Sequence, residues 1–466
     1  MNFNTPAYGV LLLVAFWGYW LSRRQSSRVA VLLVISYVFY AAWSPSYLGL
    51  IAAITLLTWW AALRIARSER PATRRGFLVI ALVGSLGALC VCKYLGFFIL
   101  EANRLCLALG MRECLPVLRI LLPVGISFYT FQAVGYIVDV YRGHVEAERN
   151  LVVFATFVAF FPQLVAGPIL RAKLFLPQLR AEASLVKAQA MDGTHRILRG
   201  LLKKAIFADL VGAFAVDPVF AAPHEYGTLA VLVAIYGYAV QIYCDFSAYT
   251  DIAIGSARLF GLHVPENFNY PYLAGNLREF WHRWHMSLST WLRDYLYIPL
   301  GGSRLGAVRT HVNLLVTMLL GGLWHGANWT FVVWGAIHGV MLALTRLVQG
   351  RRAEPGEPSR AALWLGRMAT FHLVCLGWVF FRATDLANAL DVLEALARPS
   401  AEVAIKAAGP VALGLALHFG HGPWKNRIVG VWLRMPIIAQ AAIAVLILAL
   451  VALAGQEANA FIYFQF

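Results

Sequence analysis

The sequence contains a stretch of 35 residues, 29–63, without a charged side chain. A membrane-spanning helix needs about 20 predominantly apolar residues, so this stretch has room for two short helices. The segment Trp43-Ser44-Pro45-Ser46 interrupts it, and proline breaks a helix because it lacks a backbone donor and clashes with the preceding turn. We therefore predict two short membrane spans joined by a tight turn.

Uncharged stretches recur along the whole chain. Of its 466 residues, 60% are apolar and 13% are charged, whereas soluble domains carry roughly 25% charged residues. This composition excludes a set of soluble domains, a disordered chain and a small disulfide scaffold. The sequence predicts an all-α, polytopic membrane protein with about eleven spans, forming a single domain over residues 1–466. Besides the two spans within 29–63, we expect spans at 8–22, 76–100, 120–138, 205–222, 227–244, 329–345, 361–381, 404–420 and 435–456.

The chain carries 39 Lys and Arg against 23 Asp and Glu, a net charge of +16. In a soluble protein this excess would suggest nucleic-acid binding, but the cytoplasmic loops of membrane proteins are also rich in Lys and Arg. We therefore expect the lipid bilayer, and not nucleic acid, as the partner. Basic loops follow the first span at Arg23, Arg24 and Arg28 and lie again at 64–75. Placing both loops in the cytoplasm puts the N-terminus outside.

Basic residues flank the uncharged segment 151–170 on both sides. A helix crossing the membrane here would place one basic flank outside, against the positive-inside bias. Pro162, Gly167 and Pro168 also disfavour a continuous helix. We predict a re-entrant or interfacial element whose backbone is buried in protein, followed by an amphipathic helix along the cytoplasmic face over 171–204.

The same reasoning predicts a hairpin at 312–345. Six arginines mark residues 256–310 as cytoplasmic, and the chain is basic again from Arg346, so the intervening segment enters and leaves on the cytoplasmic side. Its first limb is about 13 residues long, and its turn contains His325. The C-terminus then lies outside, and 351–360 is a polar cytoplasmic linker.

Three of the twelve histidines are candidates for chemistry: His285, His325 and His338. Ionisable groups inside a membrane are costly and are functional candidates for that reason. His325 lies at a helix break, where a neutral imidazole can act as a general base. Asn328 could orient it or donate to an oxyanion, and His338 lies in the second limb. The alternative is that each histidine is a hydrogen-bonded structural residue between helices.

Residues 281–295 contain three Trp, two Arg and two His. The i, i+3 spacing of His282 and His285 predicts that they share one helix face. Two histidines without a third ligand do not make a metal site, so we predict none. Pro271 and Pro299 flank the segment, which favours the wall of a site over an interfacial Trp/Arg belt.

Asp245 and Asp251 follow the expected span 227–244. They are either interfacial caps, together with Ser247 and Thr250, or a polar lining that receives substrate.

Cys106 and Cys114 lie in the expected outer segment 101–119, where oxidation is possible. They are candidates for a disulfide, and the alternative is two buried thiols.

Sequence motifs of several enzyme classes are missing. The chain has no phosphate-binding Walker loop, no GxGxxG after a strand and no GxSxG elbow. ATP-driven transport and serine hydrolysis are therefore disfavoured.

Two long motifs resemble the membrane-bound O-acyltransferase family: EFWHRWHMSLSTWLRDYLYIPLGGSR at 279–304 and GGLWHGANWTFVVWGAIHG at 321–339. Shorter segments of the same likeness extend it over residues 28–385, and they lie at 121–143, 160–171, 243–255 and 266–273. The most similar branch serves O-acetylation of alginate and other exopolysaccharides. One departure is His282, where that branch carries Arg.

The resemblance implies a helical fold around a central funnel and transfer of an acyl group across a bacterial inner membrane. It assigns the active-site histidine to His325, a second tunnel histidine to His285 and a recurrent position to His338. From the residues themselves we add Asn328 and Asp245 as supporting residues. The resemblance implies acetyl-CoA as a cytoplasmic donor substrate, with no bound cofactor. It also implies a periplasmic acetyltransferase partner and polysaccharide-export machinery.

Three functions remain open from the sequence. The leading one is an inner-membrane acetyltransferase for a secreted polysaccharide. The second is a D-alanyl transfer protein serving teichoic acid, whose donor is a carrier-protein thioester. The third is a polysaccharide or acyl-group transporter without chemistry of its own, because paired histidines and a re-entrant segment also suit a transport pathway.

Overall fold

The computed structural model describes residues 3–118, 120–350, 359–399, 405–420 and 423–454. Within these ranges all regular structure is helical, so the all-α prediction is confirmed. The described residues group into two compact units. The first contains residues up to Gly193 together with Ala253–Pro265, and the second contains Thr194–Ile252 and the chain from Glu266 onward.

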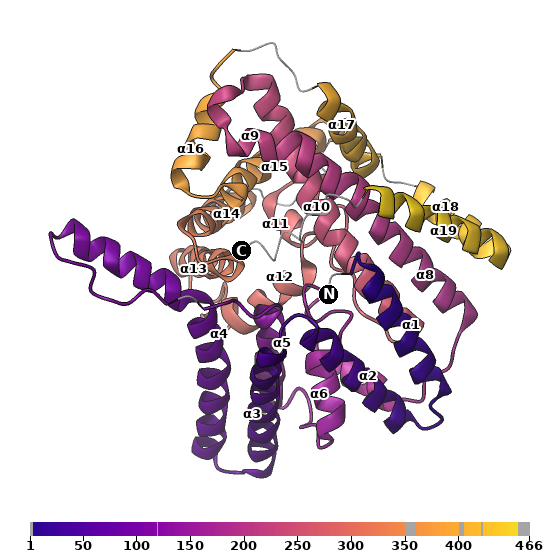
Figure 1. The fold of residues 1–466 in the computed structure, drawn as a ribbon. Helices are drawn as coiled ribbons and strands as arrows, with labels where there is room; N and C mark the ends of the chain where they lie inside the picture. The colour runs from indigo at the N-terminus through magenta and orange to yellow at the C-terminus, as the bar shows by residue number, and fades with distance from the viewer. Residues whose placement is uncertain (1–2, 119, 351–358, 400–404, 421–422, 455–466) are drawn as a thin grey trace. The chain divides into compact units, whose positions relative to one another are not determined.

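The first unit is built mainly from the N-terminal helices (Figure 1). They are α1 (Pro6–Leu21), α2 (Gln25–Ala41), α3 (Leu48–Arg67), α4 (Pro71–Ala108), α5 (Ile126–Tyr141), α6 (Leu151–Ala159) and α7 (Ala172–Arg180). A 3₁₀ turn over Pro45–Tyr47 separates α2 from α3. The predicted division of 29–63 into two helices with a tight turn is therefore confirmed.

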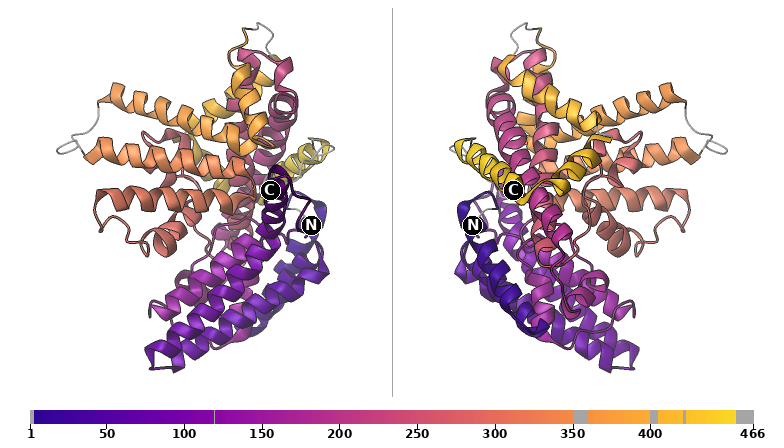
Figure 2. Two further views of the ribbon diagram at one scale, coloured as in Figure 1. Left: turned by 90° about the vertical axis from the view of Figure 1, so that its left-hand side faces the viewer. Right: turned by 90° about the vertical axis from the view of Figure 1, so that its right-hand side faces the viewer.

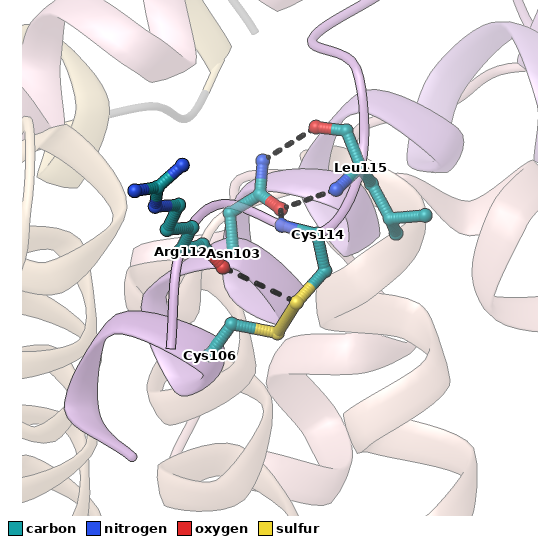
Figure 3. The surroundings of a disulfide bond; sticks show 5 residues. All are labelled: Asn103, Cys106, Arg112, Cys114 and Leu115. Carbon is teal, nitrogen blue, oxygen red and sulfur yellow. Dashed lines mark hydrogen bonds between the residues drawn. A yellow bond between two sulfur atoms is a disulfide. The ribbon is translucent and has the colours of Figure 1, made fainter. Parts of the chain in front are cut away.

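A disulfide between Cys106 and Cys114 closes the loop after α4 (Figure 3). Of the two alternatives left open for these cysteines, a bridge or two buried thiols, the structure has the bridge. The Asn103 side chain holds the same loop, because its Oδ1 accepts the backbone N–H of Cys114 at 3.1 Å and of Leu115 at 2.9 Å.

The next helix, α5, begins at Ile126. The prediction of a span from residue 120 was therefore wrong at its start. Pro123 and Gly125 lie in the missing first turn, and Gly125 has a left-handed φ of 73° and stands against the Leu164 backbone.

The segment 151–170 contains only the nine-residue α6, capped by the Asn150 side chain and ending before Pro162. Residues from Val153 to Leu170 are buried. The prediction that this backbone is buried in protein is confirmed, and its placement in the membrane stays a prediction. The expected amphipathic helix over 171–204 is two helices, α7 and α8 (Lys187–Leu202), separated by an irregular segment around Glu182.

The second unit contains most of α8 and α10 and all the helices that follow. After α8 the chain continues through π-helical turns at Lys203–Asp209 (η2) and Gly212–Val216 (η3) into α9 (Asp217–Ala221). The remaining helices are α10 (Thr228–Leu259), α11 (Leu277–Trp281), α12 (Met286–Leu292), α13 (Ala307–His325), α14 (Trp329–Gly350), α15 (Arg360–Arg382), α16 (Leu386–Ala395), α17 (Ile405–Phe419), α18 (Pro423–Arg434) and α19 (Ile437–Ala454). Neither α16 nor α18 is predicted by the sequence pattern.

The helical hairpin predicted over 312–345 is present as α13 and α14, which lie side by side with α15 (Figure 2), and its passage through the membrane stays a prediction. Its first limb is longer than expected, because α13 starts at Ala307. Glycines on both helices allow the close approach. A Cβ at Gly322 would overlap the Phe331 carbonyl oxygen, and one at Gly339 would lie 3.0 Å from the Leu315 Cα. The hairpin therefore resembles the small-residue packing of membrane helices.

Five helices of the described residues are long and apolar enough to cross a membrane. They are Pro45–Arg67, Pro71–Ala108, Thr228–Leu259, Trp329–Val348 and Arg360–Arg382. Shorter apolar helices lie at Pro6–Leu21, Gln25–Ala41, Ala408–Phe419 and Ile437–Leu453. The chain is a multi-pass membrane protein, and the count of eleven spans stays a prediction. Of the linker predicted at 351–360, residues 351–358 lie outside the described residues.

Candidate active site

His325 is the last residue of α13, at the break between α13 and α14. Gly326 follows in an extended conformation, and its missing Cβ leaves room for the Phe331 ring. The imidazole is buried, with 3% of the residue exposed. Its ring centroid lies 5.1 Å from those of Trp334 and Phe381. The predicted position of His325 at a buried helix break is therefore confirmed.

His338 projects from α14 into an aromatic cluster. Its ring centroid lies 4.7 Å from Trp334 and 5.4 Å from Trp281, and the residue is 1% exposed. Neither ring nitrogen has a hydrogen-bond partner among the described residues. Gly377 of α15 leaves room for the His338 ring, since a Cβ at Gly377 would lie 3.0 Å from the His338 Nε2.

His285 directly precedes α12 and has a left-handed φ of 41°, whereas His282 directly follows α11. The prediction that these two histidines share one helix face was therefore wrong, because the chain breaks between them. His285 is fully buried, and its Nδ1 lies 3.3 Å from the Asn267 Oδ1. Burial lowers the pKa of His285 to about 3, so the imidazole is neutral at ordinary pH.

The three histidines form one series with two indoles between them, all within the second unit. The Trp324 ring lies 6.0 Å from His285 and 5.0 Å from His325. Trp334 lies 5.1 Å from His325 and 4.7 Å from His338. The structure thus brings together three histidines that are far apart in the sequence. Buried imidazoles in an aromatic environment can accept and return protons.

Asn328 caps α14, and it also links the break between α13 and α14 to the chain after α15 by a hydrogen bond. Its Oδ1 accepts the backbone N–H of Thr330 at 3.1 Å, and its Nδ2 donates to the Thr384 carbonyl at 2.8 Å. These contacts fix the turn that follows His325. A direct role of Asn328 towards His325 or an oxyanion stays a prediction.

Asp245 lies inside α10 and not after it, because α10 runs to Leu259. The interpretation of Asp245 and Asp251 as interfacial caps was therefore wrong. Asp245 is 2% exposed, and one of its carboxylate oxygens lies 2.8 Å from the Lys204 Nζ. Lys204 also pairs with Asp209 at 2.7 Å. Asp245 belongs to a buried ion cluster between α10 and η2.

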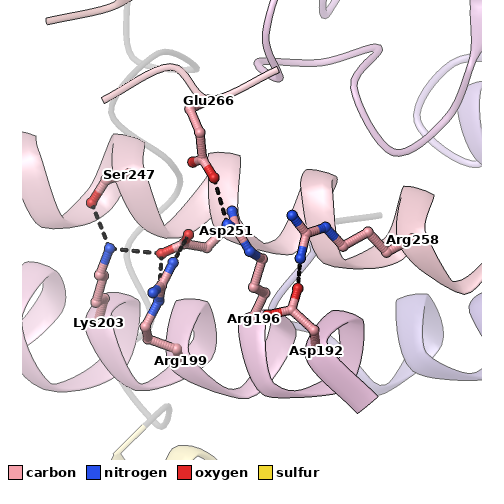
Figure 4. Close-up of polar contacts among 8 residues, drawn as sticks. All are labelled: Asp192, Arg196, Arg199, Lys203, Ser247, Asp251, Arg258 and Glu266. Carbon is pink, nitrogen blue, oxygen red and sulfur yellow. Dashed lines mark hydrogen bonds and ion pairs between the residues drawn. The ribbon is translucent and has the colours of Figure 1, made fainter. Parts of the chain in front are cut away.

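The neighbouring Asp251 is neutralised in the same way (Figure 4). It pairs with Arg199, and with Lys203 at 2.7 Å. Lys203 also donates to the Ser247 hydroxyl at 3.1 Å. These pairs explain how a 32-residue helix carries two buried carboxylates, because burying an unpaired charge costs several kcal/mol.

Sequence reasoning missed the residues that hold the histidines in place. Trp324 and Trp334 lie within the 321–339 motif, but no role is predicted for them from the sequence. Asn267 lies in the 266–273 motif without an assigned role. The signal that could have identified Asn267 is that it is a polar residue inside a motif, although it lies far in sequence from the candidate histidine.

Among the described residues, no group of three His, Cys, Asp or Glu side chains is placed to hold a metal ion.

Comparison with known proteins gives consistent matches. The model of the membrane-bound O-acyltransferase family matches residues 144–381, a range that contains all three histidines. A probable alginate O-acetylase of Pseudomonas aeruginosa is 43% identical, with 85% of this chain and 75% of that protein covered. A peptidoglycan O-acetyltransferase of Helicobacter pylori is 34% identical, with 84% and 79% covered. A teichoic acid D-alanyltransferase of Bacillus subtilis is 29% identical, with 55% and 68% covered.

Proposed function

Because this chain belongs to the membrane-bound O-acyltransferase family, we propose that it transfers acetyl groups for the O-acetylation of a secreted polysaccharide such as alginate. The protein is a membrane O-acyltransferase. The relatives that support acetyl as the group are named alginate O-acetylase and peptidoglycan O-acetyltransferase. The similarity to the D-alanyltransferase covers less of the chain and is lower, so D-alanyl transfer is the alternative. Family membership favours an enzyme over a transporter without chemistry.

One observation carries the proposed mechanism: His325 is buried at the helix break, between Trp324 and Trp334. In the proposed reaction His325 accepts the proton of the acceptor hydroxyl while the oxygen attacks the thioester carbonyl. The carbon–sulfur bond then breaks, and His325 returns the proton to the leaving thiolate. Backbone N–H groups of the break or Asn328 would stabilise the oxyanion. His285 is the second proton-accepting group, with His338 and Asp245 in supporting positions.

The proposed orientation follows the basic loops. Arg64, Arg67, Arg70, Arg74 and Arg75 lie around the junction of α3 and α4, and positive loops favour the cytoplasm. In this arrangement about eleven spans and the re-entrant segment surround a funnel. Acetyl-CoA is the donor on the cytoplasmic side of a bacterial inner membrane, and both termini lie in the periplasm. A periplasmic acetyltransferase and polysaccharide-export machinery are the proposed partners.

Replacing His325 tests this function. His325→Ala is expected to abolish O-acetylation of the polymer while the amounts of protein and polymer stay unchanged. The matched control is His263→Ala, since His263 is an exposed histidine outside the candidate site. Unchanged ester content in the His325→Ala strain would contradict the assignment. Mass spectrometry of the transferred group separates acetyl from D-alanyl transfer.

A further inference from the structure

The side chain of Asn267 organises the start of α12. Asn267 is fully buried, and its Oδ1 is the acceptor for the Ser287 backbone N–H at 3.0 Å and the Ser287 hydroxyl at 2.9 Å. The same oxygen lies 3.3 Å from the His285 Nδ1. The Asn267 carbonyl accepts the Met286 backbone N–H at 2.9 Å. One residue thus contacts three consecutive residues, 285–287.

These contacts determine where the proton of His285 lies. A backbone N–H can only donate, so the Asn267 atom that faces Ser287 must be the oxygen and not the amide nitrogen. An amide oxygen can only accept, so the nearby His285 Nδ1 must carry the hydrogen. In a neutral imidazole the other nitrogen, Nε2, then holds the lone pair.

The surroundings of His285 keep the ring neutral and in place. The Phe246 ring packs edge-on at 4.6 Å, and Trp324 lies 6.0 Å away on the side of His325. Burial among these groups is the cause of the lowered pKa of His285. A left-handed backbone is unfavourable for a non-glycine residue, and the hydrogen bonds that Met286 and Ser287 donate to Asn267 offset this cost.

We propose that Asn267 is a positioning residue that fixes the Nδ1–H tautomer of His285 and makes Nε2 the ring atom that exchanges protons during acyl transfer. This inference rests on the proposed function. The Nδ1 proton stays on the His285 ring and faces Asn267 throughout the reaction. A second proton is taken up at Nε2, which gives an imidazolium, and it leaves from Nε2 again. Asn267 acts through His285 and has no contact with substrate in this proposal.

The test measures release of CoA from labelled acetyl-CoA by the purified full-length protein between pH 3 and 9, a range that reaches down to the lowered pKa of His285. Asn267→Asp keeps the acceptor oxygens and loses no hydrogen bond, because the Asn267 Nδ2 has no partner among the described residues. The carboxylate of Asn267→Asp stabilises the protonated, imidazolium form of His285. The acid limb of the pH profile, where the rate falls as the pH drops, is therefore expected to move up by about one pH unit or more. Asn267→Ala removes the acceptor and is expected to lower the rate about 100-fold.

A matched substitution controls for the added charge. Asn150→Asp also places a carboxylate where an asparagine Oδ1 accepts two backbone N–H groups, at the start of α6, and it is expected to leave the pH profile unchanged. In a His285→Asn background, Asn267→Asp is expected to have no further effect on the profile, because the titrating ring is gone.

Three results would overturn the inference. They are an unshifted profile in folded Asn267→Asp, a shift that persists in the His285→Asn background, or a wild-type rate in Asn267→Ala. Where the buried aspartate lowers the yield, Asn267→Ser supplies a neutral acceptor and is expected to retain more activity than Asn267→Ala, and equal losses would count against the proposal. Failure of the proposed function is distinguishable, since wild-type protein would then show no CoA release dependent on His325.

Discussion

His285 combines two uncommon properties, a left-handed backbone and a fully buried ring. Tyr270 is the other non-glycine residue with positive φ among the described residues. Such residues persist where the surrounding structure holds them, and they concentrate at functional sites. Asparagine tolerates this backbone region better than most residues, and its side-chain N–H can replace the donor at Nδ1. His285→Asn therefore removes the titrating ring with little change to the backbone.

This variant allows the pH dependence of stability to be assigned to one residue. The unfolded chain protonates His285 near pH 6.5, whereas the folded protein does so only near pH 3. Between these values the unfolded state binds more protons, so the protein loses stability as the pH falls, by up to about 1.4 kcal/mol per pH unit. We expect the Tm of wild-type protein in detergent to fall more steeply from pH 7 to pH 4 than that of His285→Asn. Parallel curves would contradict the neutral, buried state of this histidine.

At the scale of elements, the α13–α14 hairpin places His325 and His338 on either side of Trp334. The helices approach closely at Gly335, where a Cβ would overlap the Met318 carbonyl oxygen and lie 3.1 Å from the Leu319 Cα. Since both neighbours are backbone, the clash cannot be relieved by rotating a side chain.

Gly335→Ala is therefore expected to push the two helices apart, to destabilise the protein by about 1–3 kcal/mol and to reduce acyl transfer. A thermal-shift assay and CoA release measure the two effects. Gly87→Ala in α4 is the control, because a Cβ there meets nothing within 4 Å and alanine favours the helix. Equal Tm values for the two variants would show that the hairpin does not depend on this close contact.

The sequence predicts helices well where a local rule decides their ends. Pro45 and Pro162 interrupt helices through their own backbone chemistry, and these breaks were predicted correctly. The end of α10 was predicted wrongly because Asp245 is neutralised by Lys204, a partner on another helix. The break at His285 was missed for a similar reason, since Asn267 stabilises it from 18 residues away. Pairings distant in sequence leave no periodic signal.

At the scale of the whole molecule, two independent features concern orientation. The basic residues 64–75 favour the cytoplasm. The disulfide between Cys106 and Cys114, at the other end of α4, favours an oxidising compartment. A 38-residue helix is about 57 Å long and exceeds the membrane core of about 30 Å. Both features therefore agree with the proposed orientation, in which α4 crosses from the cytoplasm to the periplasm.

The two ends of α3 give the most direct test of this orientation. Ser46 precedes α3 on the expected outer side, Glu69 follows it on the expected inner side, and both are exposed. A membrane-impermeant maleimide should label Ser46→Cys in cells with an intact inner membrane, and Glu69→Cys only after permeabilisation. Wild-type protein controls for labelling of its free cysteines, of which Cys90 is exposed. The opposite labelling pattern would contradict the proposed topology and the proposed cytoplasmic entry of acetyl-CoA, because the side of every later loop is counted from this helix.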